Sequence, residues 1–501
     1  MRSKNALKNI ISSLLLQLIT IICGFIVPKM IISTYGSATN GLINSIVQFL
    51  GYITLLESGF GPVVKSLLYK PIAQKNRSQI EEILYSTERF FRNIAKIFIV
   101  YILVLVIVYP VMINKQFDTI YTISLIIIIS ISTFAEYFFG ITYKLYLQSE
   151  QKTYVTSYIQ LGATFINTIL IVILIKTNCS IQLVKLVSSL IFVLKPIIQN
   201  YYIKKKYNLN LKNAKGSFVI KQKWDGLVQH IAAVIHGNTD IAILTIFSTM
   251  EEISVYSVYL LIINGVKKII NAFNDGIDAS FGDMIAKNEN LNKSFSTYEF
   301  FYHTISTITF TCTIILITPF VEVYTSGVND VNYIRPLFGL FLTLAEYMWS
   351  IRLPYSSIVL AAGHFKETKK GAWVEAVTNI VISIILVFKF GIIGVAIGTL
   401  IAMTIRTIEF MYHTSKYILN RNQIKSFIWL AIVIAETSVC IIISNFLYPK
   451  GMGNYTEWFK YAIIIFIIAV IVVLPTNMLI FKNERKNLKE LINYVLKKGN
   501  K

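Results

Sequence analysis

Long apolar stretches recur from one end of the chain to the other, and short polar segments separate them. A helix that crosses the roughly 30 Å hydrocarbon core of a membrane needs about 20 mostly apolar residues. About fourteen stretches satisfy this requirement, at 10–32, 41–64, 94–113, 120–143, 155–175, 181–201, 226–247, 253–282, 299–322, 333–360, 372–389, 391–413, 426–448 and 458–480. The pattern therefore predicts an all-α polytopic membrane protein with about 14 transmembrane helices.

The composition agrees with a membrane protein and excludes several other classes. Of the 501 residues, 55% are hydrophobic and 15% are charged, whereas soluble proteins carry about 25% charged residues. The segments between the predicted spans are too short for a soluble catalytic domain, and no HExxH, GxSxG or P-loop motif occurs. We therefore expect a protein that is not an enzyme, with no catalytic residues, no metal site and no cofactor.

Basic residues predict the orientation of the chain. The net charge is +21, from 47 Lys and Arg against 26 Asp and Glu, an excess that is also found in nucleic-acid-binding proteins. Here the basic residues gather in alternate loops between the spans, for example in 65–77 and 204–223. Because basic loops face the cytoplasm and its anionic leaflet, both termini are predicted to lie inside (N-in/C-in). This placement argues against nucleic acid as a partner.

The second half of the chain repeats the first at an offset of about 215 residues. Residues 32–35 (Ile-Ser-Thr-Tyr), which end the first span, correspond to residues 247–250 (Phe-Ser-Thr-Met), which end the seventh. Such repeats are typical of transporters that handle a substrate between two halves. The pattern predicts two pseudo-symmetric six-helix lobes, at 1–215 and 216–425. Residues 426–501 add two further transmembrane helices and a basic amphipathic tail, which we expect to lie on the inner membrane surface.

The polar residues of the predicted span 253–282 share one face. On an α-helix they fall within an arc of about 100°, and they are Asn264, Lys267, Lys268, Asn271, Asp275 and Asp278. A lysine that faced lipid at mid-span would cost about 2.5–3.5 kcal/mol. A water-lined substrate cavity removes this cost, and so does pairing with Asp275, Asp278 or a carboxylate of a neighbouring helix. Our hypothesis is the cavity, in which Lys268 lies nearest the centre of the stripe and is the main cation for the substrate.

Two further spans carry polar stripes. The second span presents Asn44, Gln48 and Lys65 on one face, and the first span presents Gln17. Such donors and acceptors suit a hydroxyl-rich substrate, although helix packing through small and polar residues produces the same pattern. Glu57 points away from the Asn44 face, so we expect it to pair with a lysine of a neighbouring helix. We expect Pro62 to kink this span.

Several titratable residues fall within the predicted spans, where such groups are functional candidates. Our candidates for ion coupling are Asp240 and His230, because they lie in the first helix of the second lobe. A membrane histidine can also be an ordinary packed residue. The other titratable residues within the spans are Glu136, Lys185, His236, Glu346, Arg352, Glu375, Arg406, Glu409 and Glu436.

Short motifs near the N-terminus resemble those of a known family. They are Gly24-Phe25-Ile26-Val27-Pro28, Tyr35-Gly36, Asn40-Gly41-Leu42 and Glu57-Ser58-Gly59-Phe60-Gly61. This opening resembles the polysaccharide (Wzx-type) flippases, which export O-antigen or capsule repeat units. These belong to the multidrug/oligosaccharidyl-lipid/polysaccharide (MATE-like) exporter superfamily. Thr239-Asp240 and Val255-Tyr256-Ser257 are similar to the start of the family's second lobe.

The resemblance implies a substrate, a location and partners. The substrate would be an undecaprenyl-pyrophosphate-linked oligosaccharide, moved across the bacterial cytoplasmic membrane during cell-surface polysaccharide or lipopolysaccharide biosynthesis. Its partners would be membrane lipids and the glycan polymerase and glycosyltransferases of the same pathway. The related lipid II flippases have a central cavity rich in arginine, whereas the predicted spans of this chain hold few arginines and mostly lysines instead. The alternatives are an ion-coupled multidrug (MATE-type) exporter and a lipid II-type flippase.

Overall fold

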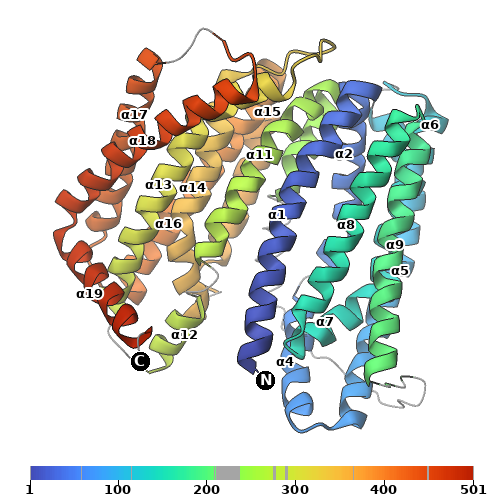
Figure 1. Cartoon of the computed structure of the whole chain (residues 1–501), viewed down its shortest axis with the longest axis horizontal. Helices are drawn as coiled ribbons and strands as arrows, with labels where there is room; N and C mark the ends of the chain where they lie inside the picture. Colours follow the sequence, from blue (N-terminus) through green and yellow to red (C-terminus); the bar gives the residue numbers. More distant parts are fainter. Residues whose placement is uncertain are drawn as a thin grey trace. The chain divides into compact units, whose positions relative to one another are not determined.

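The computed structural model describes residues 2–57, 59–113, 116–207, 209, 211, 237–274, 278–287, 291–364, 366–447 and 451–499. All regular secondary structure in these ranges is helical (Figure 1). Eleven of the described helices are long and apolar enough to cross a membrane, or twelve if one bent helix pair is counted as a single span. The all-helical polytopic architecture is thereby confirmed, whereas the total of about 14 spans and the N-in/C-in orientation stay predictions.

Even when the bent pair is counted as a span, two of the fourteen predicted spans are missing from the count, for different reasons. The first is α14 (Pro336–Ala361), whose length suffices but which carries Glu346 and Arg352 within its apolar sequence. The second is the predicted span 226–247, because residues 226–236 lie outside the described residues. Its described part is a helix at 237–247.

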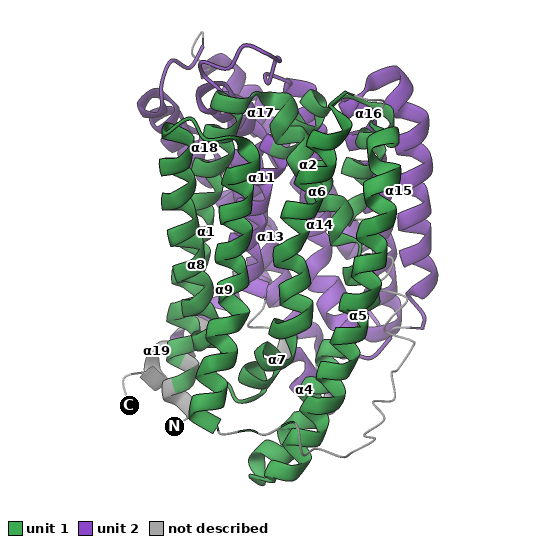
Figure 2. Cartoon of the chain, turned by 90° about the vertical axis from the view of Figure 1, so that its right-hand side faces the viewer, with its two compact units in different colours: residues 1–257 green, residues 258–501 purple. Residues whose placement is uncertain are grey.

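The chain divides into two compact units, residues 1–257 and 258–501 (Figure 2). The predicted lobe boundaries near residues 215 and 425 stay a prediction. The helices of the first unit are α1 (Arg2–Tyr35), α2 (Ser37–Gly51), α3 (Thr54–Glu57), α4 (Phe60–Ala73), α5 (Arg77–Met112), α6 (Thr119–Ala135), the π-helix η1 (Glu136–Gly140), α7 (Ile141–Ser149), α8 (Thr153–Lys176), α9 (Ile181–Tyr207), the helix at 237–247 and the start of α11 (Met250–Asn274). In this unit α1 packs along α8, and α9 packs against both α6 and α8.

The second unit is built around α13 and α14. It contains the rest of α11, α12 (Asp278–Ala286), α13 (Leu291–Tyr324), α14, α15 (Lys369–Phe390), α16 (Ile392–His413), the π-helix η3 (Thr414–Ile418), α17 (Ile424–Leu447), α18 (Tyr455–Ile480) and α19 (Lys482–Gly499). Helix α16 packs against α14 and α15, while α13 packs against α14, α17, α18 and α19. The core of this unit is aromatic, with Phe295, Phe310, Tyr347 and Tyr355 at most 1% exposed.

The second predicted span is interrupted rather than simply kinked. Helix α2 ends at Gly51, the short helix α3 follows, and α4 begins at Phe60. Gly59, which precedes α4, has a φ of 77°, a backbone conformation that glycine adopts without strain. The break therefore precedes Pro62, which lies in the first turn of α4, where a helix tolerates proline.

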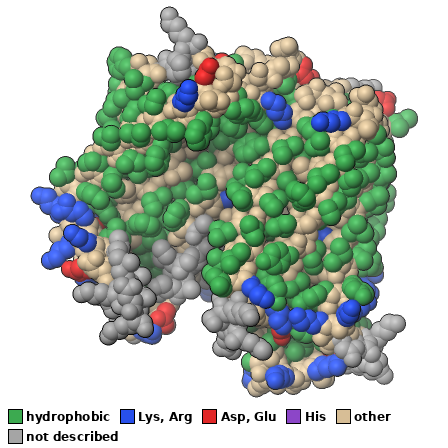
Figure 3. Space-filling view, in the orientation of Figure 1, with side chains coloured by type: hydrophobic (Ala, Val, Ile, Leu, Met, Phe, Trp, Pro, Cys, Tyr) green, Lys and Arg blue, Asp and Glu red, His purple; other side chains and the backbone are tan. Residues whose placement is uncertain are grey.

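Hydrophobic side chains cover most of the visible surface of both units, and Lys and Arg gather mainly toward its two ends (Figure 3). Among the exposed side chains are Ile107, Val111 and Ile120, each more than 70% exposed. A protein surrounded by water rarely exposes apolar area on this scale. The surface is that of a protein surrounded by lipid.

Gly41 marks a close approach within the first unit. A Cβ atom at this position of α2 would overlap the backbone carbonyl of Met250, the first residue of α11. We expect Gly41→Ala to lower the free energy of unfolding by about 1–3 kcal/mol, because neither backbone can move without disturbing its own helix. Thermal unfolding of the purified protein measures this.

The matched control is Gly162→Ala in α8. Outside its own helical turn, no atom of the described residues lies within 4 Å of a Cβ built at Gly162, and alanine favours a helix interior by roughly 0.5–1 kcal/mol over glycine. This variant should be as stable as the wild type or slightly more stable. Equal stability of the Gly41 and Gly162 variants would contradict the close approach.

Candidate functional site

A polar cavity of about 340 Å³ lies inside the first unit. Helices α3, α6, η1, α7 and α9 contribute its lining, which consists of Thr54, Glu57, Ser132, Thr133, Glu136, Tyr137, Ile141, Lys144, Phe192 and Lys195. Its volume is at the lower end of the range for small-molecule sites. Carboxylates, ammonium groups and hydroxyls together line this cavity.

Ion pairs organise the charges of the cavity. The Glu136 carboxylate lies 2.9 Å from the Lys195 ammonium and 3.8 Å from that of Lys144. The Tyr137 hydroxyl donates a hydrogen bond of 3.0 Å to Glu57. The prediction that Glu57 pairs with a lysine is therefore wrong for this structure. Its partner is a tyrosine, since both cavity lysines lie against Glu136.

A second cavity of about 190 Å³ shares Glu136, Lys144 and Lys195 with the first. Its other lining residues come from α1, α8 and α9, and they are Leu16, Thr156, Ser157, Gln160 and Gln199. Gln17, predicted to bind substrate, is half-buried next to Leu16 but does not line this cavity. The cluster of Glu136, Lys144 and Lys195 thus lines both cavities of the first unit.

Local backbone geometry places the Glu136 carboxylate. Glu136 begins η1, and π-helical turns are frequent at functional sites. A Cβ atom at Gly140 would lie 3.2 Å from the Glu136 carboxyl carbon and 3.2 Å from Cβ of Pro196 in α9. The absence of a side chain at Gly140 therefore lets η1 approach α9, so that Glu136 meets Lys195.

Polar side chains also join the helix at 237–247 to α2 and to α11. The Gln48 amide donates a hydrogen bond to the side chain of Asn238, and the Tyr256 hydroxyl donates one of 2.8 Å to Asp240. The Asn44 amide donates to the carbonyl of Asn40, 2.8 Å away in the preceding turn. In this structure the predicted residues Asn44, Gln48 and Asp240 are thus engaged in contacts within the first unit. His230, the other candidate for ion coupling, lies outside the described residues.

The two lysines of α11 have different surroundings. The Lys267 ammonium lies 2.6 Å from the Glu346 carboxylate of α14 and 4.3 Å from the centre of the Trp349 ring. This is the pairing with a neighbouring helix that we considered as the alternative to a cavity. Lys268 is half-buried and has no hydrogen bond or ion pair with any residue that the structure describes.

The remaining residues of the predicted stripe are spread over different environments. Asn264 is exposed and Asn271 is half-buried. Asp275 lies outside the described residues, and so does the side chain of Asp278. Lys65 in α4 is half-buried and, like Lys268, has no ion pair within the described part of the chain.

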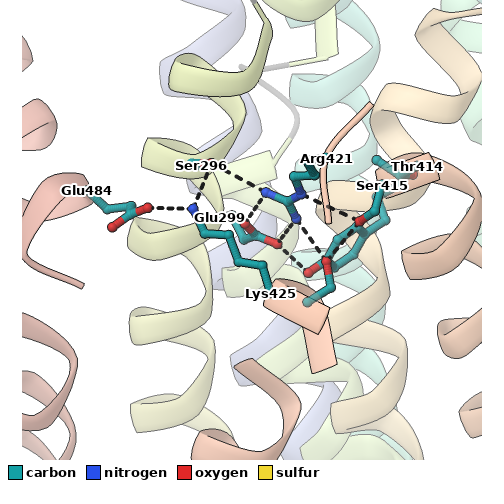
Figure 4. A network of polar contacts seen from close by, with 9 residues as sticks. Ser296, Glu299, Thr414, Ser415, Arg421, Lys425 and Glu484 are labelled. Atoms are coloured by element: carbon teal, nitrogen blue, oxygen red, sulfur yellow. Dashed lines mark hydrogen bonds and ion pairs between the residues drawn. The ribbon is translucent and has the colours of Figure 1, made fainter. Parts of the chain in front are cut away.

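A buried ion-pair network lies in the second unit (Figure 4). The Arg421 guanidinium donates to both carboxylate oxygens of Glu299, at 2.6 and 2.8 Å, and the Tyr355 hydroxyl donates to the same carboxylate. Glu299 is 0% exposed. Lys425 is joined to Glu484 of α19 at 2.6 Å. Lys425, at the start of α17, also donates to Ser296 of α13 at 3.3 Å, so the network ties the loop before α17, the start of α17 and the C-terminal helix to α13.

Sequence reasoning missed several members of these clusters. Lys144 and Lys195 were not singled out, and Glu299 was passed over as the first residue of the predicted span 299–322. A charged residue inside each of two spans was the available signal for Glu136 and Lys195. Their pairing depends on how η1 and α9 pack, which the sequence pattern does not specify.

Comparison with known proteins identifies the fold. No family model matches the chain, and no curated protein sequence matches it. The chain has the fold of transporters and flippases of the MOP superfamily. A solved structure of the lipid II flippase MurJ in an inward closed conformation aligns with a TM-score of 0.67 and 17% identity, covering 95% of this chain and 99% of that chain.

Two further solved structures share the fold. An inward-facing multidrug resistance MATE transporter of the MOP superfamily aligns with a TM-score of 0.61 and 13% identity, covering 80% of this chain and 94% of its own. A MOP superfamily transporter from Pyrococcus furiosus, described as having a binding pocket of reverse polarity, aligns with a TM-score of 0.55 and 13% identity, covering 84% and 97%. With its apolar helices, this fold makes the chain a multi-pass membrane protein.

Proposed function

We propose that the protein flips undecaprenyl-pyrophosphate-linked oligosaccharide repeat units across the bacterial cytoplasmic membrane for cell-surface polysaccharide biosynthesis. The observation that carries this proposal is the contrast between the two lysines of α11. Lys267 is neutralised by Glu346, whereas Lys268 keeps its charge unpaired within the described residues. A cation held in a membrane helix is costly unless it meets water or an anion. Pyrophosphate is such an anion.

The extent of the structural likeness supports a lipid-linked substrate. The flippase structure covers 95% of this chain, compared with 80% for the inward-facing MATE transporter and 84% for the Pyrococcus transporter. The same likeness favours a lipid II-type flippase as the second candidate. An ion-coupled multidrug exporter is a third, although an unpaired lysine does not favour a cationic drug.

The substrate path of the proposal uses the residues singled out from the sequence. Lys268 would bind the pyrophosphate, with Lys65 as a second unpaired cation, while Gln17, Asn44, Gln48, Asn264 and Asn271 would offer amides to the sugars. Asp240 and His230 remain our candidates for coupling to an ion gradient. The glycan polymerase and glycosyltransferases of the same pathway would be functional partners.

A transport assay with purified protein in liposomes tests the proposal. We expect fluorescent undecaprenyl-pyrophosphate oligosaccharide to cross the bilayer when an ion gradient is applied, and a protonophore together with a sodium ionophore to stop that movement. Lipid II and a cationic dye are the competing substrates in parallel samples. Faster movement of lipid II would assign the second candidate, and export of the dye alone would assign the third.

A further inference from the structure

A buried carboxyl group without a partner lies in the second unit. Glu436, in the middle of α17, is 3% exposed. Neither of its carboxylate oxygens has a hydrogen-bond partner among the described residues. Four other buried carboxylates of this unit, Glu299, Glu346, Glu375 and Glu484, each contact a Lys or Arg side chain. Glu436 contacts no Lys or Arg side chain among the described residues.

The polar groups around Glu436 are already engaged with one another. The hydroxyls of Thr311 and Thr437 are hydrogen-bonded at 3.0 Å, and the Tyr347 hydroxyl donates to Thr307 at 2.7 Å. These groups offer no shell of free oxygens such as a metal cation needs. An unpaired carboxylate in this environment is far costlier than the neutral acid, so the described surroundings of Glu436 favour the protonated form.

A second unpartnered titratable group lies about two helical turns nearer the start of α17. His303 of α13 is 1% exposed, and neither ring nitrogen has a hydrogen-bond partner among the described residues. Its ring lies 5.4 Å from that of Trp429 and 5.9 Å from that of Tyr355. Trp429 precedes Glu436 by seven residues, or roughly 10 Å along the helix.

The described surroundings of His303 and Glu436 provide neither group with an ion-pair partner. The Glu299 carboxylate one turn before His303 is occupied by Arg421 and Tyr355. The titratable and charged groups that face the pair come from α13, α14, α17 and the loop before α17, and they are Glu299, Cys312, Tyr347, Tyr355, Cys440 and Arg421. The described side chains of α18 that pack here, such as Asn477, carry no charge.

We propose that Glu436 is a proton-binding site in the membrane-embedded core of the second unit, and that His303 is a second titratable group on the path of the same proton. The carboxylate takes a proton from water on one side and returns it to water on the other, and no bond other than O–H forms or breaks. This site adds to the proposed function, and it rests on that function only for the link between proton binding and transport. It is independent of Asp240 and His230.

Infrared difference spectra of the purified full-length protein, recorded between neutral and alkaline pH, test the site directly. We expect the wild type to show the C=O band of a buried protonated carboxyl that is lost as the pH rises. Glu436→Gln should lack this band. The matched control is Glu409→Gln, which should keep it, because Glu409 forms an ion pair with Arg406. A band that persists in Glu436→Gln would overturn the proposal.

Two further measurements complete the test. If Glu436→Gln does not fold, Glu436→Asp should shift both the band and the pH at which it disappears, and an unshifted band would again overturn the proposal. Loss of the band on adding sodium at constant pH would replace the proton with a metal cation and would equally overturn it.

A transport measurement distinguishes a failure of this proposal from a failure of the proposed function. In liposomes, Glu436→Gln should lose the response of glycan flipping to a pH gradient, while wild-type protein keeps it. Failure of the wild type to move the glycan would contradict the proposed function but leave the infrared result intact. A variant that still responds fully to the pH gradient would overturn the assigned role of Glu436.

Discussion

Replacing Lys268 with alanine is expected to abolish movement of the lipid-linked glycan while the protein stays inserted and folded. A pyrophosphate brings at least two negative charges into a region where unpaired charge is costly, so the protein must supply cations there. Because Lys268 has no partner among the described residues, its removal leaves none of their charges uncompensated. Liposome transport and thermal unfolding of the same preparation measure the two effects separately.

Lys268→Arg should retain part of the activity, since arginine keeps the charge but imposes a different, planar geometry. Lys267→Ala is the informative comparison. The sequence alone predicts a milder loss of transport for it, and the structure adds a loss of stability because Glu346, 7% exposed, would lose its cation. The double variant Lys267→Gln with Glu346→Gln should regain stability. If Lys268→Ala transported normally, the polar face of α11 would have a structural role only. Lys65 would then be the next candidate for the cation that binds the substrate.

Arg421→Ala is expected to lower the free energy of unfolding by about 3–5 kcal/mol, the usual cost of breaking one side of a buried ion pair. The cause is the Glu299 carboxylate, which is 0% exposed and would keep only the Tyr355 hydroxyl and no cation. Arg421→Lys should restore only part of the loss, because a single ammonium cannot donate to both carboxylate oxygens as the guanidinium does. Thermal or chemical unfolding in detergent measures the difference.

The control for this variant is Arg77→Ala. Arg77 and Glu81 form an ion pair one turn apart on α5, with the Arg77 side chain 53% exposed. Exposed pairs of this kind contribute roughly 0.3–0.5 kcal/mol. If Arg421→Ala were no more destabilising than Arg77→Ala, the network of Figure 4 would not contribute to the free energy of unfolding as proposed.

Most of the fold could be predicted from the sequence because lipid imposes one repeated requirement, a run of apolar residues long enough to cross the bilayer. Helix ends were harder to predict. The predicted spans 94–113 and 299–322 are the apolar parts of longer helices, since α5 begins at Arg77 and α13 begins at Leu291. Backbone hydrogen bonding continues from the apolar stretch into polar sequence, which a hydropathy pattern does not detect. The break before Gly59 was missed because glycine within an apolar run gives no sign of its backbone angle.

The candidate site could be predicted only as single residues. The polar face of α11 was visible in the spacing of Asn264, Lys267 and Lys268. That Lys267 would meet Glu346, 79 residues away along the chain, depends on the packing of α11 against α14. The same holds for Glu436, whose place within a span was evident but whose lack of partners required the structure.

The π-helix η1 bears on how chains of this fold can differ in length. Its hydrogen bonds join residues five apart, so it holds one residue more than an α-helical turn over the same rise. Deleting one residue from 136–140 can therefore restore regular α-helix while α6 and α7 keep their buried faces. The same deletion in the middle of α8 would rotate everything after it by about 100°. A one-residue gap in an alignment at η1 is consequently compatible with an unchanged fold, and it is a position where relatives can gain or lose the Glu136 cavity without repacking the bundle.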